Sequence, residues 1–280
     1  MSRPLFSCVV PVKGARPFIT DALASLKAQG LGEELEIIVQ DGGVGSGVVG
    51  EFVSGGVESG GVRYYREDDN GQSDALNKGF AKANGEWLFW LNADDVLLPG
   101  ALMKVKQLLH FSTPPLTTLN WIVGNQLLID DSGKVLKCSV GNGWHDWLYR
   151  NAVPHVYGPS AFYRRELFEK VGGFDVNLKY CMDWDLWIKL MKAGAKFVRI
   201  NDYLWAQRQW SGSKTQRKVP KEEVKGHWDE IGAMLDKTGM NVTWLGNLRM
   251  RMWRLMNGNV LRQCLDGIRF KGSTVGELCL

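Results

Sequence analysis

The sequence has few cysteines and histidines, and neither type forms a recognisable site motif. No C-x-x-C is present, the four His are isolated, and the five Cys are scattered at Cys8, Cys138, Cys181, Cys264 and Cys279. Disulfide frameworks and zinc sites of the usual spacing are therefore excluded, and we expect reduced thiols in a cytosolic protein. A G-x-G-x-x-G after the first predicted strand is also missing, which argues against a dinucleotide-dependent dehydrogenase.

Long apolar runs are absent as well. No stretch reaches the roughly 18 uninterrupted apolar residues of a membrane span, and the first apolar run is short and contains Pro, so it predicts a strand and not a signal peptide. The net charge of +4 is uneven: residues 1–207 carry 21 Lys/Arg and 23 Asp/Glu, whereas residues 208–280 carry 13 and 7. A basic tail of this kind fits nucleic acid, an anionic membrane or a phosphate-bearing ligand.

Strand and helix patterns alternate over the first 110 residues. The apolar runs that predict strands lie at 6–12, 35–43, 62–67 and 86–92. Helical spacing with suitable end signals occurs at 17–30, 71–85 and 99–111. The short strand–helix–strand units predict parallel strands in a doubly wound α/β sheet. Within the fourth strand, Trp87 and Trp90 are predicted core residues, and the glycine-rich residues 42–61 predict a long connection.

The regular alternation of predicted strands and helices ends near residue 110. Residues 120–137 predict a hairpin that turns at Asp131-Ser132-Gly133. The segments that follow predict a strand and a helix over 156–174, an amphipathic helix over 181–194 and an extended segment over 195–210. The remainder of the chain is predicted to be helical, with helices at 222–237 and 243–256.

Carboxylates follow two of the predicted strands. Asp41 ends the second strand, and the adjacent Asp94 and Asp95 follow the apolar run "WLFWLN". Ligands of open α/β sheets bind outside the carboxyl ends of the strands. Asp41 alone also fits a turn and Asp94 a helix cap. Two adjacent carboxylates repel each other, and a divalent cation such as Mg²⁺ or Mn²⁺ would relieve that repulsion. The pair therefore predicts a site for metal and phosphate.

Five blocks in this order resemble those of the family-2 glycosyltransferases with the GT-A fold, in particular bacterial enzymes of surface-polysaccharide assembly. The blocks are "IIVQDGG", "EDDNGQSDALNKGFAKANGEWLFWLNADDVLLPGAL", "GPSAFYRRELFEKVGGFD", "YCMDWDLWIKLMKAGAK" and "RQWSGSKT", within about residues 5–215. The resemblance implies a Rossmann-like, mostly parallel open sheet flanked by helices. We expect a catalytic domain over 1–218, with a nucleotide-sugar half (1–110) and an acceptor half (111–218), and a basic helical extension over 219–280.

The resemblance also implies roles for individual residues. Asp41 would read the nucleotide base, Asp74 would face the nucleoside and sugar, and Asp94 would face the ribose or the metal. Asp95 would hold Mn²⁺ or Mg²⁺ on the diphosphate, and Asp183 would be the general base. The other residues assigned to the nucleotide-sugar are Pro11, Gln72, Asn77, Lys78, Asn92, Ala93, Arg208 and Lys214. Trp184 and Asp185 are assigned to the acceptor.

The implied reaction moves a sugar from a nucleotide-diphosphate sugar, expected to be a UDP-sugar, to a hydroxyl of a saccharide or lipid-linked acceptor; nucleic acid has no part in it. Asp183 would take the hydroxyl proton, and a single displacement inverts the anomeric carbon. Without the resemblance, Asp183 is equally an acid favoured at a helix N-terminus. Asn92, Met182 and Trp210 stand where the family often has Asp, Glu and His. These departures keep open an inactive nucleotide-sugar-binding protein, and the strand-end acids alone also fit a sugar nucleotidyltransferase.

The predicted helix at 243–256 carries an apolar stripe. Arg249, Arg251 and Arg254 lie mostly off this stripe, which consists of Trp244, Leu245, Leu248, Met252, Leu255 and Met256. One interpretation is a helix packed on the catalytic domain. The other is an interfacial helix that contacts anionic lipid at the inner face of the membrane, which would suit a lipid-linked acceptor.

Overall fold

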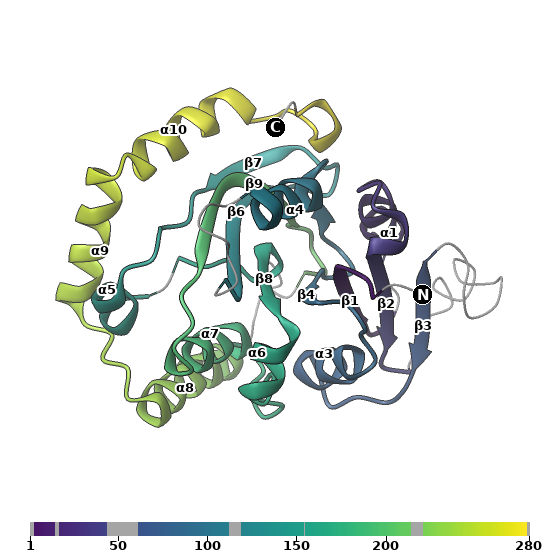
Figure 1. Ribbon diagram of the computed structural model, residues 1–280. Helices are drawn as coiled ribbons and strands as arrows, with labels where there is room; N and C mark the ends of the chain where they lie inside the picture. Colours follow the sequence, from purple (N-terminus) through teal and green to yellow (C-terminus); the bar gives the residue numbers. More distant parts are fainter. Residues whose placement is uncertain are drawn as a thin grey trace.

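The computed structural model describes residues 3–14, 17–43, 61–111, 119–153, 155–213 and 221–278. In these residues nine strands form one sheet, in the order β3-β2-β1-β4-β8-β6-β9-β5, with β7 beside β6 (Figure 1). The strands are β1 (Phe6–Val12), β2 (Leu35–Asp41), β3 (Val62–Arg66), β4 (Trp87–Trp90), β5 (Val96–Leu97), β6 (Trp121–Ile129), β7 (Val135–Ser139), β8 (Ala161–Arg164) and β9 (Val198–Arg208). The helices are α1 (Ile19–Lys27), α3 (Gln72–Ala81), α4 (Ala101–Phe111), α5 (Asp146–Asn151), α6 (Arg165–Lys170), α7 (Met182–Lys192), α8 (Lys221–Thr238), α9 (Trp244–Met256) and α10 (Asn259–Phe270).

The N-terminal half is the doubly wound unit that the alternating pattern predicts. Strands β3, β2, β1 and β4 are parallel neighbours, so their carboxyl ends share one edge of the sheet. Helices α1 and α4 cover one face of the sheet, while α3, α6 and α7 cover the other (Figure 1). Because both faces are covered, β2 is buried along its whole length. The predicted α/β sheet flanked by helices is thereby confirmed.

The second half of the sheet mixes directions. β8 is antiparallel to β4 and to β6, and the predicted hairpin is confirmed as the antiparallel pair β6–β7. β9 runs parallel to β6, and it also pairs with β5, a strand of two residues that the sequence did not predict. β5 follows Asp95 directly. Segment 91–95 therefore leads from the middle of the sheet to its far edge, at the position where the acids stand.

Aromatic stacking fills the core beneath the second half. Trp90 of β4 stacks on Trp187 of α7 with ring centroids 6.0 Å apart, and Trp187 stacks on Trp121 of β6 at 5.3 Å. All three rings are buried, as is Trp87, so the prediction of Trp87 and Trp90 as core residues is confirmed. Helix α7 is thus held against the sheet through its apolar face.

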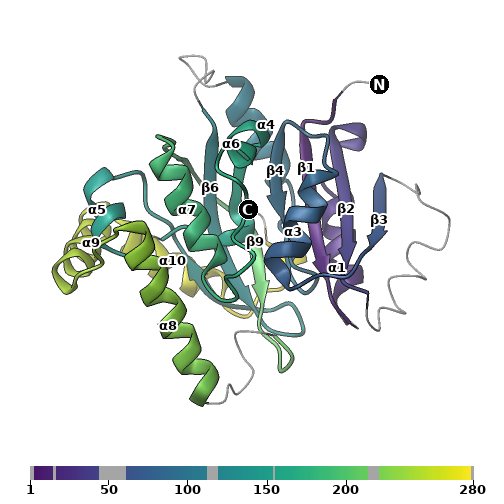
Figure 2. The same ribbon diagram turned by 90° about the horizontal axis from the view of Figure 1, so that it is seen from below.

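The C-terminal helices lie along the outside of this core. Figure 2 shows α8 beside α7, and α9 beside α5, in agreement with the contacts of Met234 with Ile188 and of Met250 with Leu148. Helix α10, which the sequence did not delimit, runs over β7 and buries Phe270 there. None of the helices in the described ranges is both long and apolar enough to cross a membrane. The glycine-rich residues 44–60 and Lys214 lie outside those ranges.

Gly79 permits the close approach of α3 to β1, which predicts a specific loss of stability. A Cβ atom at Gly79 would lie 2.5 Å from Cγ1 of the buried Val9. We expect Gly79→Ala to lower the free energy of unfolding by about 1–3 kcal/mol through overpacking. Gly267 of α10 is the matched control, because a Cβ there meets nothing within 4 Å. Gly267→Ala should stabilise by up to about 1 kcal/mol through helix propensity. Urea unfolding of both variants tests this, and equal effects would contradict it.

Candidate active site

A cleft of about 750 Å³ opens at the carboxyl edge of the parallel strands. It lies where β1 and β4 end and where α3 and α7 begin. Eight residues predicted from the sequence line it: Pro11, Gln72, Asn92, Ala93, Asp94, Asp95, Asp183 and Arg208. Two distant parts of the chain, the block after β4 and the start of α7, therefore share one cavity.

Asp95 is a buried carboxylate held by two donors. It is only 1% exposed, yet Asn92 Nδ2 donates to its Oδ2 atom (2.7 Å) and the backbone N–H of Arg208 donates to its Oδ1 atom (2.9 Å). Burial first, and the charge of Asp94 second, raise the pKa of Asp95 above its usual value. Because both of its oxygens accept hydrogen bonds, Asp95 holds segment 91–95 in place. This favours Asp94 over Asp95 as the carboxylate that binds a ligand.

The amide at Asn92 has a structural reason. Gln72 Nε2 donates to Asn92 Oδ1 (2.9 Å) while Asn92 Nδ2 donates to Asp95. An amide can accept and donate at once, whereas an ionised Asp at this position could only accept. It would place another negative charge against Asp95. Asn92 therefore links α3 to the acidic segment, which the departure from the family pattern alone did not reveal.

Arg208 is bound within the protein and not directed at the cleft alone. Its guanidinium pairs with Asp21 of α1 (2.9 Å), donates to the backbone oxygens of Asp94 (3.1 Å) and Asp131 (2.9 Å), and lies over the ring of Phe18. The side chain is almost fully buried. These contacts argue against the predicted role in binding the diphosphate and favour a role in fixing the backbone of Asp94.

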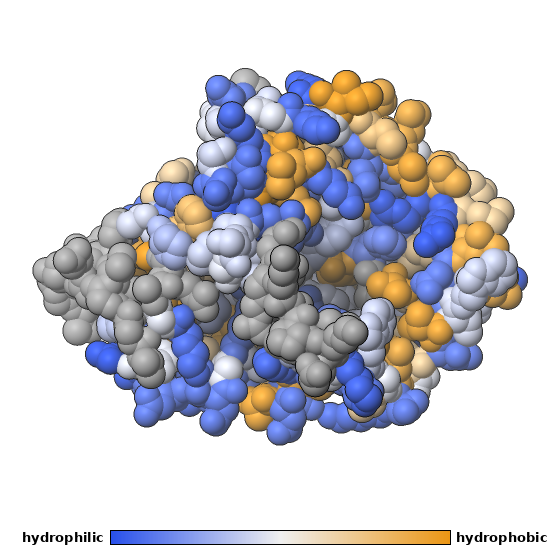
Figure 3. Space-filling model, turned by 180° about the vertical axis from the view of Figure 1, so that it is seen from behind, coloured by the Kyte–Doolittle hydropathy of each residue, from blue (hydrophilic) through white to orange (hydrophobic). Residues whose placement is uncertain are grey.

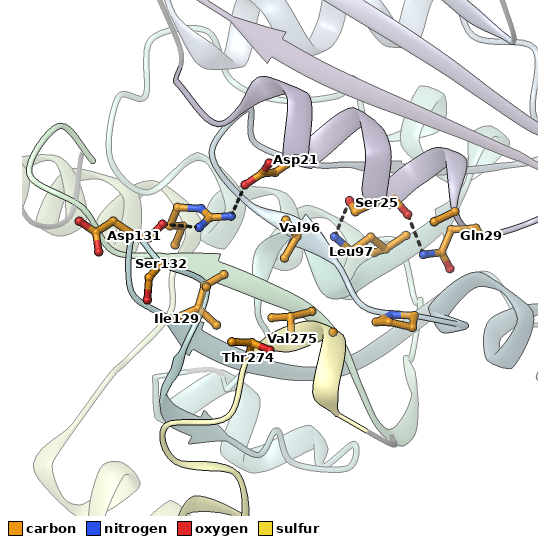
Figure 4. Close-up of a pocket in the computed structure, with 15 residues that line it drawn as sticks. Asp21, Ser25, Gln29, Val96, Leu97, Ile129, Asp131, Ser132, Thr274 and Val275 are labelled. Carbon is orange, nitrogen blue, oxygen red and sulfur yellow. Dashed lines mark hydrogen bonds and ion pairs between the residues drawn. The ribbon is translucent and has the colours of Figure 1, made fainter.

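Helix α1 contacts the residues that follow Asp95 and the side chain of Arg208. Asp21 and Ser25 of α1 and Gln29 just beyond its end follow one another at intervals of four residues, and Figure 4 shows them on the side that faces Val96 and Leu97 of β5. Ser25 Oγ accepts a hydrogen bond from the backbone N–H of Leu97 (3.0 Å). Together they border a smaller cavity of about 340 Å³. Sequence reasoning missed this face, because its polar residues read as solvent-exposed positions of a helix.

Asp94 accepts a hydrogen bond from Trp210, which the sequence did not predict. Trp210 Nε1 donates to Asp94 Oδ2 (3.0 Å), and the Trp210 ring packs edge-on against Phe18. The sequence placed Trp210 where the family often has His. An indole N–H is a donor only and cannot ligate a cation, so at this position Trp210 competes with any cation for the same carboxylate oxygen.

Asp183 occupies the first turn of α7 and lines the cleft. Glu230 of α8, which the sequence did not single out, accepts hydrogen bonds from the backbone N–H groups of Lys179 (2.8 Å), Tyr180 (2.7 Å) and Cys181 (2.9 Å). Burial works to raise the pKa of Glu230, but these donors outweigh it and lower the pKa. Glu230 thus fixes the loop that positions Asp183.

The four predicted residues of α3 divide into two groups. Gln72 lines the cleft. Asn77 instead ties α3 to the loop after α6, since its amide exchanges hydrogen bonds with the backbone of Phe174. Asp74 pairs with Lys78 (2.9 Å) and accepts from the Asn70 N–H (3.0 Å), and these contacts lower the pKa of Asp74. Asp74, Asn77 and Lys78 do not line the cleft formed by the described residues.

Three further predicted residues do not line the cleft formed by the described residues. Asp41 is buried at the end of β2, where it accepts from the Tyr64 hydroxyl and from the Gly43 N–H. Asp185 is buried and pairs with Lys189 of the same helix (2.7 Å), while Trp184 packs in the apolar cluster between α7 and α8. This placement argues against the predicted acceptor contacts of Trp184 and Asp185.

Lys13 and Asp69 line the cleft but were missed. They form an ion pair of 3.2 Å at its mouth, where the Lys13 side chain is 53% exposed. Lys13 comes directly after β1, so the same argument that singled out Asp41 and Asp94 at strand ends would have found it. An exposed cation beside the acidic segment is suited to an anionic ligand.

The residues present fit a divalent cation only in part. No group of three His, Cys, Asp or Glu side chains that could hold a metal alone is found within the described ranges. Mg²⁺ is commonly held by one or two carboxylates together with substrate phosphates. Asp94 supplies one such carboxylate in the cleft, so the donor set fits a cation shared with a bound diphosphate.

Asn92 yields a prediction that depends on pH. We expect Asn92→Asp to lower stability by about 1–3 kcal/mol more than Asn92→Ala near pH 8, because it adds a charge against Asp95. A carboxyl whose pKa is raised on folding destabilises in its ionised form, so the difference should shrink as the pH falls towards 5. Thermal melts without divalent cations test this. A difference between the two variants that is independent of pH would contradict the charge argument.

Solved structures share this fold. TarS of S. aureus in complex with UDP-GlcNAc superposes with a TM-score of 0.62 at 16% identity, over 82% of this chain and 65% of that chain. The mannosyltransferase PcManGT from Pyrobaculum calidifontis, in complex with GDP-Man and Mn²⁺, superposes with a TM-score of 0.55 at 16% identity, over 93% of this chain and 81% of that chain. At these identities the likeness shows the fold alone, and it confirms the predicted GT-A type of α/β fold.

Sequence relatives carry glycosyltransferase names. A PGL/p-HBAD biosynthesis glycosyltransferase of Mycobacterium bovis is 26% identical over 234 residues, which cover 80% of this chain and 84% of that protein. An uncharacterized glycosyltransferase of Rickettsia bellii is 26% identical over 244 residues, and the match covers 81% of this chain but 33% of that longer protein. The model of glycosyl transferase family 2 matches residues 7–172, more than half of the sequence. The chain belongs to glycosyl transferase family 2.

Proposed function

We propose that this chain transfers a sugar, with inversion, from a nucleotide-diphosphate sugar to an acceptor hydroxyl. The observation that carries the proposal is the shared cleft, in which Asp183 at the start of α7 faces the same cavity as Asn92–Asp95 after β4. A general base and an acidic strand end in one cavity are what a single displacement requires. Family membership favours transfer of a glycosyl group over transfer of a nucleotidyl group.

Asp183 acts on the acceptor. A hydroxyl is a weak nucleophile, and a carboxylate within hydrogen-bond reach takes its proton as the oxygen attacks the anomeric carbon. The new bond to the acceptor oxygen forms as the bond to the diphosphate oxygen breaks, so the configuration inverts. Glu230 supports this step indirectly, because it fixes residues 179–181 immediately before Asp183.

Asp94 and Lys13 serve the leaving diphosphate. Asp94 would hold Mn²⁺ or Mg²⁺ jointly with the diphosphate, and the bound cation neutralises charge on the leaving group. Asn92, Asp95 and Arg208 keep Asp94 in place through the hydrogen bonds described above. Lys13 adds a cation at the mouth of the cleft, and Lys214 remains a predicted contact.

The donor is proposed to be a UDP-sugar. TarS and PcManGT were solved with UDP-GlcNAc and with GDP-Man and Mn²⁺, respectively, so the fold accommodates both bases. Asp41 remains the residue proposed to read the base. We assign residues 1–110 to the donor and residues 111–218 to the acceptor, which we propose to be a saccharide or a lipid-linked saccharide at the cytoplasmic side of a membrane.

Replacing the proposed general base, Asp183, should slow the chemical step without weakening the binding of the nucleotide. We expect Asp183→Asn to lower kcat by about 10²–10⁴-fold and to leave nucleotide affinity unchanged. Release of nucleoside diphosphate from a panel of nucleotide-sugars, with Mn²⁺ and an acceptor, measures the rate. Asp229→Asn is the matched control, since Asp229 is exposed on α8 and pairs only with Lys225 among its described salt bridges. An unchanged rate for Asp183→Asn would remove Asp183 from the mechanism.

Trp210 should lower the affinity of the cleft for Mn²⁺, because its N–H occupies an oxygen of Asp94. We expect chelation with EDTA to abolish transfer and Mn²⁺ to restore it. Trp210→Phe keeps an aromatic ring against Phe18 but removes the N–H that competes for Asp94. It should therefore lower the half-saturating Mn²⁺ concentration by about tenfold, the equivalent of one hydrogen bond to a charged group.

Two outcomes, one of the Mn²⁺ titration and one of the donor panel, would count against the proposed roles. An unchanged titration for Trp210→Phe would show that Asp94 is not the metal carboxylate. Tight binding of nucleotide-sugars by the unmodified chain, without turnover of any donor in the panel, would favour the inactive binding protein that the Trp210–Asp94 contact keeps in view.

A further inference from the structure

Most of the apolar side chains of α9 and α10 face away from the protein. On α9 their exposed fractions run from 36% for Leu248 to 82% for Met256, and on α10 from 56% for Leu265 to 81% for Ile268. We call the set the apolar rim; it consists of Trp244, Leu245, Leu248, Met252, Leu255, Met256, Leu261, Leu265 and Ile268. Figure 3 shows apolar side chains gathered along the edge of the molecule that these two helices form.

Towards the protein each helix turns one buried apolar side chain, Met250 of α9 and Phe270 of α10, and otherwise mainly polar or small residues. Arg254 of α9 is buried and donates to Val140 O (2.8 Å) and to Asn142 Oδ1 (3.2 Å). On α10, Asp266 accepts a hydrogen bond from the Tyr203 hydroxyl (2.7 Å) and Asn259 donates to Asn142 (3.2 Å). A helix that covers a core normally buries its apolar stripe, as α7 does. Helices α9 and α10 instead expose most of their apolar side chains.

This orientation is fixed by close contact. A Cβ atom at Gly246 would lie 1.7 Å from the carbonyl oxygen of Asn151, so α9 rests directly on the end of α5. Thr243 Oγ1 accepts from the Gly246 N–H (2.9 Å) and caps the helix. Turning the apolar rim inward would break these contacts and leave the buried Arg254 without its acceptors. The rim is therefore a feature of the packed protein.

The charge around the apolar rim is of one sign. Residues 239–276 contain six Arg or Lys and a single acid, Asp266, which is engaged by Tyr203. The exposed cations are Arg249, Arg251, Arg269 and Lys271. A second copy of the chain placed symmetrically on this face would bring like charges together. An anionic surface complements both the cations and the apolar stripe.

We propose that α9 and α10 together form a docking surface for an anionic lipid bilayer. The apolar rim would enter the boundary between headgroups and acyl chains, and the exposed arginines would meet the lipid phosphates. Because no helix in the described ranges can span a membrane, the contact is peripheral. The surface includes α10, beyond the segment 243–256 that the sequence indicated. The proposal stands independently of glycosyl transfer, since docking requires no turnover.

Vesicle sedimentation of the full chain tests the docking surface. Sucrose-loaded vesicles of phosphatidylcholine alone are compared with vesicles that also contain phosphatidylglycerol. The unmodified chain should pellet with the second kind and remain in solution with the first. The triple variant Leu261→Gln, Leu265→Gln, Ile268→Gln should partition at least about tenfold less, because several apolar side chains lose their burial. A matched control with Met103→Gln and Leu136→Gln, exposed apolar residues outside the rim, should bind as the unmodified chain does.

The electrostatic contribution is tested separately. Arg251→Gln combined with Arg269→Gln should weaken binding to anionic vesicles and reduce its dependence on salt. Equal binding of the unmodified chain to both vesicle types, or equal binding of the triple variant and its control, would overturn the proposal. It would also be overturned if light scattering showed a dimer that the triple variant converts to a monomer, with no vesicle binding by either protein, because a second copy would then cover the rim.

Discussion

Asp95 lies in the interior at the end of β4, where an ionised carboxylate needs donors that replace the water it has lost. Asn92 and the backbone of Arg208 supply those donors, and each is itself anchored: Asn92 by Gln72 of α3, and Arg208 by Asp21 of α1. One buried carboxylate thereby joins two helices and two strands at the carboxyl edge of the sheet. The adjacent acids divide their tasks, because the fixed one lets Asp94 face the cleft.

The sequence predicted the features that depend on local patterns, and it did not predict those that depend on contacts between distant parts of the chain. The parallel strands, the hairpin and the helices were predictable because their signals are local periodicities. The strand β5 was missed because it has two residues and pairs with β9, more than a hundred positions along the chain. The acids at strand ends were found by type and place. Their separate roles depend on hydrogen-bond partners from α1, α3 and β9, which no local pattern discloses.

The boundary between the predicted catalytic domain and its extension is also less sharp than composition indicates. Glu230 of α8 belongs to the basic extension, yet it accepts three backbone hydrogen bonds from residues 179–181. Those residues precede Asp183, and Met234 of α8 packs against Ile188 farther along α7. Helix α8 therefore holds the N-terminus of α7, where the proposed base Asp183 lies, and a truncation before residue 219 would remove this support.

The same extension connects the cleft with the surface that carries the apolar rim. Helix α9 rests on α5 and α10 on β7, so the rim is attached by fixed contacts to the half of the molecule that we propose binds the acceptor. Burying Arg254 while exposing Trp244 and Met256 runs against the usual partition of side chains between core and water. Val140, Asn142 and Gln263 supply the acceptors that the buried guanidinium of Arg254 needs in this arrangement. The exposed apolar stripe is stabilised only when a partner removes it from water. A lipid surface that also presents the acceptor would place that acceptor beside the half of the molecule proposed to bind it.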